Sequence, residues 1–197
     1  MLVPITRVLR RLRQPRSRAE ELRAVRRRFE RSGRAGVEER AVAVRMRALR
    51  QELAATFGDA RSCATCAVGR PMPIGRFDGG HCCSGATDDV LSDAEVAALA
   101  TGGTRPRDLR PPDSDHAGCA FRGERGCTLD AANRPNVCVR FVCRGFSHEL
   151  FQRDVLDRVE ALSDELDTLF ARFTALRGAR LLDEEWAALG AAARWRG

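Results

Sequence analysis

The eight cysteines of this chain are its most reactive residue set, and they fall into two groups of four. Each group combines two pairs, and the groups are Cys63, Cys66, Cys82 and Cys83, then Cys119, Cys127, Cys138 and Cys143. A tetrahedral thiolate site needs a backbone that folds back, so that several sulfurs reach one point. Gly123, Gly126 and the Arg134-Pro135 pair supply turns of that kind. The spacing therefore predicts a metal site built on cysteines from both groups.

The metal is left open by the cysteines, because thiolates bind zinc and also iron–sulfur clusters. Adjacent residues such as Cys82 and Cys83 usually point in different directions, which indicates two centres or one centre with supporting thiols. More than four available thiols slightly favour an iron–sulfur cluster over zinc. His81, His116 and Arg140 lie near cysteines in the sequence and are candidate ligands or supporting residues, although each histidine fits a polar loop role equally well.

The absence of a signal-peptide core at Met1 to Ile5, and of any apolar run near ~18 residues, predicts a cytoplasmic protein with no membrane partner. Thiols stay reduced in the cytoplasm, so the cysteines indicate metal or redox chemistry. In an oxidising compartment the same count would instead indicate four disulfides. A chain of 197 residues is long enough to bury a core without them.

The order of the cysteine motifs resembles the CxxCxxCC family of zinc- or iron-chelating domains, the YkgJ-like proteins. The matching residues are Cys63, Cys66, Gly80, Cys82, Cys83, Gly118, Cys119, Phe121, Cys127, Leu129, Arg134, Pro135, Cys138, Phe141 and Cys143. The resemblance implies metal chelation by residues 63–143. Because the family includes flagellin lysine methylases, it also implies an alternative function, a metal-dependent group-transfer enzyme such as a protein methyltransferase.

The resemblance has one departure, in the first cysteine motif. Fifteen residues separate Cys66 from Cys82, where the family has two. The insertion, residues 67–81, makes Cys63 and Cys66 less secure as ligands than the other six cysteines.

Positive charge is concentrated at the N-terminus. Residues 1–57 contain 16 arginines and six glutamates, a net charge of +10, whereas the whole chain has +7. Clustered arginine can bind a polyanion, so a second alternative is a zinc-stabilised interaction module whose basic arm binds nucleic acid or an acidic partner. We favour a solvated helix face with ion pairs, because no aromatic residues for base stacking are interleaved.

Hydrophobic periodicity predicts a mainly α protein, a helical bundle around a loop-rich cysteine core with little β structure. The expected organisation is a flexible basic tail at 1–16, a helical arm at 17–58, a metal-binding core at 59–146 and a long helix with a short terminal helix at 147–197. Capping boxes predict helix starts at Ser17 and Ser92, and Gly58 ends the arm, which is expected to be a hairpin or bent. A short hairpin is expected within residues 120–129.

The long helix is expected to begin at the cap Ser147 and to end at Gly178. Its apolar stripe is Val155, Val159, Leu162, Leu166, Leu169, Phe173 and Leu176. We expect the arm to bury this stripe, with arm arginines meeting acidic residues of the helix; a homodimer through residues 147–177 is the alternative. The terminal helix, Asp183 to Trp195, is expected to dock on the bundle.

Overall fold

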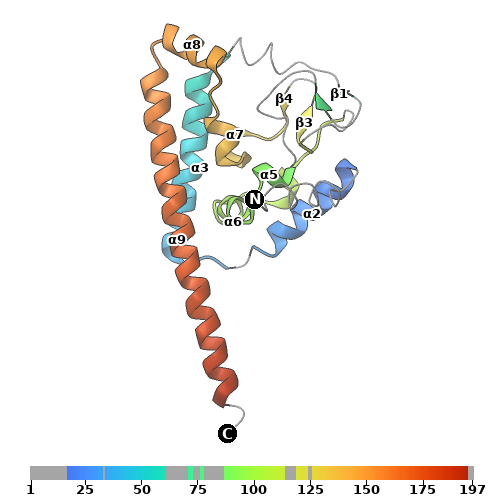
Figure 1. Ribbon diagram of the computed structural model, residues 1–197, viewed down its shortest axis with the longest axis vertical. Coiled ribbons are helices and arrows are strands. Elements are labelled where there is room, and N and C mark those ends of the chain that lie inside the picture. Colours follow the sequence, from blue (N-terminus) through green and yellow to red (C-terminus); the bar gives the residue numbers. More distant parts are fainter. Residues whose placement is uncertain are drawn as a thin grey trace, which may run out of the picture.

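The computed structural model describes residues 17–32, 34–60, 87–113, 119–123 and 126–194, together with the backbone of two short strands at 71–72 and 76–77 (Figure 1). The described chain is mainly helical with little strand, as predicted. Several predictions lie outside the described residues: the tail at 1–16, Cys63, Cys66, Cys82, Cys83, His81 and His116.

The main core lies between two long helices, α3 (Val37–Phe57) and α9 (Leu156–Arg194), which run side by side in Figure 1. Apolar residues of α3 pack here against the predicted stripe of α9: Met46, Leu49 and Leu53 with Val159, Leu162, Leu166 and Phe173. Each of these side chains is at most 2% exposed. The predicted pairing of the long helix with the arm is therefore confirmed.

The ion pairs between α3 and α9 differ from the expectation in their direction. Arg45 of α3 does bind the acidic Glu165 of α9, at 2.8 Å. Elsewhere the polarity is reversed, because Glu39 and Glu52 of α3 bind arginines of α9, namely Arg180 and Arg158. Most of these pairs are exposed to solvent, so they set the register of the two helices more than they stabilise them.

A second core lies between α2 (Arg18–Glu30) and α6 (Asp93–Thr101). The capping box of Ser17 and Glu20 starts α2 as predicted, and Leu22, Val25 and Phe29 form its buried face. Helix α6 also packs against α3, so it lies between the two helices of the arm (Figure 1). The arm is therefore not a hairpin of two helices packed on each other: each helix packs against α6.

Short elements connect these helices. Helix α5 (Thr87–Val90) and the 3-10 turn η2 (Pro106–Asp108) flank α6. Strands β3 (Arg122–Gly123) and β4 (Gly126–Cys127) form the expected antiparallel hairpin, which is followed by η3 (Ala131–Asn133), α7 (Asn136–Arg140) and α8 (Arg144–Gln152). A further pair, β1 (Pro71–Met72) with β2 (Arg76–Phe77), was not predicted from the sequence.

The predicted start of the long helix at Ser147 is wrong. Cys143 is the N-cap of a separate helix, α8, and Ser147 lies inside it, where its N–H bonds to the Cys143 carbonyl at 2.8 Å. The chain breaks after α8 because Asp154 adopts a left-handed conformation, with φ of 55°. Aspartate tolerates this region better than most residues, and it ends the helix in the way that glycine usually does.

The predicted end at Gly178 is also wrong, because α9 continues through it to Arg194. A glycine inside a helix costs only about 1 kcal/mol, and the helix formers around Gly178 outweigh that cost. The expected terminal helix is thus the second half of α9, and it projects away from the body (Figure 1). No helix among the described residues is both long and apolar enough to cross a membrane.

Candidate functional site

Four of the eight predicted ligands lie in the described part of the chain, and none of these four cysteines is in a disulfide. Cys119 precedes strand β3 and Cys127 ends strand β4. Cys138 lies within α7, and Cys143 is the exposed N-cap of α8. The first two pack against the core between α2 and α6, whereas α7 and α8 contribute Val139 and Phe146 to the core of α3 and α9.

The β3–β4 hairpin brings Cys119 and Cys127 near each other. The Arg122 N–H donates to the Cys119 carbonyl at 2.9 Å, and Arg122 faces Cys127 across the hairpin. Gly126 has φ of 105°, which glycine adopts without strain, and this permits the turn. Burial, with a smaller contribution from the charge of Cys127, raises the pKa of the Cys119 thiol to about 11. Cys119 is therefore a neutral thiol at pH 7 unless a cation offsets its charge.

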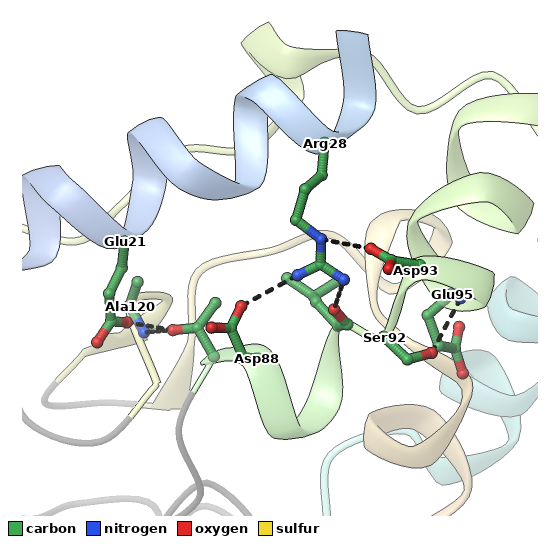
Figure 2. A network of polar contacts seen from close by, with 9 residues as sticks. Glu21, Arg28, Asp88, Ser92, Asp93, Glu95 and Ala120 are labelled. Atoms are coloured by element: carbon green, nitrogen blue, oxygen red, sulfur yellow. Dashed lines mark hydrogen bonds and ion pairs between the residues drawn. The ribbon is translucent and has the colours of Figure 1, made fainter. Parts of the chain in front are cut away.

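A buried hydroxyl connects the cysteine turn to helix α2 (Figure 2). Thr87 accepts a hydrogen bond from the Ala120 N–H at 2.9 Å and donates one to the Glu21 carboxylate. Thr87 is 2% exposed and Glu21 7%. The Cys119 thiol is also hydrogen-bonded to Thr87, which lowers its pKa and partly opposes the effect of burial. These contacts fix the backbone beside Cys119.

Arg28 holds the same segment from the other end (Figure 2). Its guanidinium reaches Asp93 at 2.8 Å and Asp88 at 3.0 Å, and it also donates to the Leu91 carbonyl. Because Arg28 lies on α2 and its partners lie on α5, on α6 and between them, the residue connects three elements. The position of Thr87 next to the cysteine turn therefore depends on α2.

Other arginines of the basic arm bind backbone carbonyls. Arg18 donates to Pro112 at 2.6 Å and to Arg122 at 3.3 Å, and Arg26 donates to Leu109 at 3.2 Å. Hydrogen bonds from a charged donor are about twice as strong as neutral ones. These arginines thus hold the loops around the hairpin.

A buried polar cluster holds the segment that carries Cys138. Arg50 of α3 donates from Nε to Asn136 Oδ1 at 2.9 Å, and the Asn136 backbone N–H donates to Glu95 Oε1 at 3.1 Å. The exposed fractions of Arg50, Glu95 and Asn136 are 0%, 6% and 2%. Among the described residues, both terminal nitrogens of Arg50, Glu95 Oε2 and Asn136 Nδ2 have no hydrogen-bond partner.

Burial moves both ionisable groups of this cluster toward their neutral forms. It raises the pKa of Glu95 to about 7, and the attraction of Arg50 only partly opposes the shift. It lowers the pKa of Arg50 to about 10, again against the attraction of Glu95. At neutral pH the guanidinium stays charged, while Glu95 is close to half protonated.

The neighbouring turn η3 is held in a similar way. Asn133 Oδ1 accepts hydrogen bonds from Thr104 at 2.9 Å and from Arg47 at 3.1 Å. Arg134, the residue before Pro135, donates to the Leu129 carbonyl at 2.7 Å. The Arg134-Pro135 turn is thus attached to α3 and to the loop after α6 before the chain enters α7.

Arg140, a predicted ligand or supporting residue, forms an ion pair with Asp167 of α9. His148 contacts Gln152 within α8 through its ring nitrogen at 3.1 Å. Both residues therefore make contacts within the helical part of the fold.

Of the described candidate ligands, the structure brings Cys119 and Cys127 together. In the described part of the chain, no three His, Cys, Asp or Glu side chains form a group that could hold a metal ion. The sequence analysis missed Glu21, Thr87, Arg50 and Asn136 altogether. Glu95 follows the predicted cap Ser92, and its backbone N–H does donate to Ser92 Oγ at 3.2 Å, but its carboxylate accepts from the Asn136 N–H, a contact that the sequence did not reveal.

Comparisons with family models, with curated proteins and with solved structures found no match. The resemblance to YkgJ-like proteins thus rests on the order of the motifs alone.

Proposed function

We propose that this is a metal-binding protein whose eight cysteines, from two segments, hold an iron–sulfur cluster or zinc. The observation that carries the proposal is the pair of free thiols, Cys119 and Cys127, held near each other by the β3–β4 hairpin. Two sulfurs on one tight hairpin are a common way to supply half of a thiolate site.

The electrostatics of Cys119 support a cation at this place. A thiol whose pKa is raised to about 11 by burial is a poor ligand as it stands, but a metal ion compensates the thiolate charge that burial penalises. Binding then releases the thiol proton, so metal affinity falls as pH falls. The donors fit a soft metal: they are sulfurs, they are free, and they lie at the edge of an apolar core.

Buried polar contacts hold in place the two chain segments that carry the described cysteines. Thr87 and Glu21 hold the backbone at Cys119, and Glu95 and Arg50 hold the segment that leads to Cys138. A metal bound by Cys119 and Cys127 together with Cys138 and Cys143 would connect the core of α2 and α6 with the core of α3 and α9. A cluster would supply electron transfer or substrate activation, and zinc would supply rigidity.

Anaerobic purification followed by metal and sulfide analysis tests the proposal. Iron with acid-labile sulfide and absorption near ~400 nm would indicate a cluster, and a colourless protein with stoichiometric zinc would indicate a structural site. A protein that holds neither metal after expression with both supplied would overturn the proposal.

Two variants assign the ligands. Cys119→Ser and Cys138→Ser should each lose metal, and Cys138→Ser should increase hydrogen exchange in residues 118–143 while α9 stays protected. Ser163→Ala, on α9, is the control and should keep its metal. Full metal content and unchanged thermal unfolding in both cysteine variants would contradict the assignment.

A further inference from the structure

The second half of α9 carries large apolar side chains that the described chain does not cover. The exposed fractions of Leu181, Leu182, Trp186 and Leu189 are 45%, 56%, 71% and 57%. The same helix buries Leu166 and Phe173 completely where it runs beside α3. The exposure therefore begins beyond the N-terminal end of α3, and it is not a general property of α9.

The apolar stripe continues along the helix without interruption. After Leu176, which packs on the α3 core, small or apolar residues follow at 179, 182, 186, 189 and 193, a spacing of three or four. Such spacing keeps the residues on one face of a helix. The same face of α9 that packs against α3 therefore stays apolar in the part of the helix that extends past α3.

The lengths of the two helices explain why the stripe is left over. Helix α9 has 39 residues and α3 has 21, about 58 Å and 31 Å at ~1.5 Å per residue. The first turn of α3 lies beside Arg180, which binds Glu39. Residues 181–194 extend past this level (Figure 1). A helical segment as short as residues 181–194 is only marginally stable in water by itself, so packing against a partner would stabilise it.

The order of charges along this segment is self-complementary in one orientation. Asp183, Glu184 and Glu185 lie near its start, where Glu184 pairs with Arg180 of the same helix at 2.7 Å, and Arg194 lies at its end. Two copies in parallel would bring like charges together. Two antiparallel copies would bring the acidic residues of each copy to the arginine end of the other, with Leu182 opposite position 193 and Trp186 opposite Leu189.

We propose that residues 181–194 of α9 are a dimerisation surface, on which a second copy of this chain packs antiparallel. The Ala-rich end of the segment, residues 191–193, favours this, because small residues there leave room for Leu182 of the other copy, while Trp186 and Leu189 meet at the centre. The interface differs from a dimer through residues 147–177, whose stripe is occupied by α3.

Sedimentation equilibrium of the full chain, with its metal and under reducing conditions, tests the interface. The wild type should be a concentration-dependent dimer, and Trp186→Glu with Leu189→Glu should raise the dissociation constant at least about tenfold. Val44→Glu is the matched control, because Val44 is also apolar and 55% exposed but lies on α3. It should dimerise as the wild type does.

Charge reversal tests the orientation. Asp183→Arg with Glu185→Arg should weaken an antiparallel dimer, and adding Arg194→Glu in the same chain should restore part of the loss. A parallel dimer would be unaffected by either change, and that result would overturn the antiparallel arrangement. A monomeric wild type, or a dimer that survives Trp186→Glu with Leu189→Glu, would overturn the proposed surface altogether. Circular dichroism of each variant would check that it is folded.

Discussion

Glu95 Oε1 accepts a hydrogen bond from the backbone N–H of Asn136 at 3.1 Å, which connects α6 to the first residue of α7. The contact spans 41 residues and lies in the interior, with both side chains nearly inaccessible to solvent. A carboxylate at a helix N-terminus is stabilised by the helix dipole, but burial opposes ionisation and prevails here. The position of the Cys138 helix is thus coupled to an ionisable group.

Replacing Glu95 by glutamine should change how stability depends on pH. Burial raises the folded-state pKa of Glu95 to about 7 from 4.5, so the stability that it contributes is complete below 4.5 and is lost as pH rises to 7. From pH 5 to pH 8 the wild type should therefore lose about 2 kcal/mol of unfolding free energy relative to Glu95→Gln. Denaturant unfolding at both pH values measures this. Glu160→Gln, at an exposed position of α9, is the control, and an equal pH dependence in Glu95→Gln and wild type would contradict the prediction.

Replacing Arg50 by methionine should destabilise the protein by about 3 kcal/mol. The change removes the donor to Asn136 Oδ1 and leaves the Glu95 carboxylate without the charge that offsets its burial. Adding Glu95→Gln should recover part of the loss, because the buried charge is then gone. Arg158→Met should cost less than 1 kcal/mol, because Arg158 is exposed and its partner Glu52 is partly exposed. Equal stability of Arg50→Met and Arg158→Met would show that the buried cluster has no special role.

The Thr87 hydroxyl should stabilise the fold through its hydrogen bonds and not only through its packing. Thr87→Val keeps the shape of the side chain but removes the acceptor for the buried Ala120 N–H and one donor to Glu21. We expect a loss of about 2 kcal/mol and faster hydrogen exchange at residues 119–123, because a buried polar group loses its partner. Thr168→Val, at an exposed position of α9, is the control. Unchanged exchange at residues 119–123 would contradict the proposed role of Thr87.

The sequence predicted the local features of the fold well. Ser17 with Glu20, the stop at Gly58 with φ of 54°, and the apolar spacing of α3 and α9 are each determined by residues within a few turns of one another. The break at Asp154 was missed because no glycine or proline marks it. The passage of α9 through Gly178 was missed because a glycine alone does not end a helix.

The site was less predictable, because its contacts join distant residues. Thr87 and Glu21 are 66 positions apart, and Arg50 and Asn136 are 86 apart. Periodicity places such residues on a helix face, but it does not say which buried polar groups will meet. The cysteines were found because their type alone restricts their chemistry, whereas the residues that hold them carry no such signature.

The two halves of α9 should respond differently to the same truncation. Leu166→Ala removes a fully buried side chain from the α3 core and should cost about 3 kcal/mol. Leu189→Ala removes a side chain that is 57% exposed and should change stability by less than 0.5 kcal/mol at low protein concentration. Thermal and denaturant unfolding of both variants measures this. A large loss in Leu189→Ala under those conditions would mean that the projecting segment packs on its own chain.

Thiol labelling should separate Cys119 from Cys143 in metal-free, reduced protein. A thiol with a pKa of about 11 is ionised in roughly one molecule in a thousand at pH 8, and only the thiolate reacts. Iodoacetamide should therefore modify the exposed Cys143 at least about tenfold faster than Cys119. The Cys119 rate should keep rising with pH toward 11, as mass spectrometry of the peptides would show. Denatured protein is the control, because unfolding should remove the difference. Equal rates in the folded protein would mean that the hairpin does not bury Cys119, and the electrostatic support for a metal at this position would be lost.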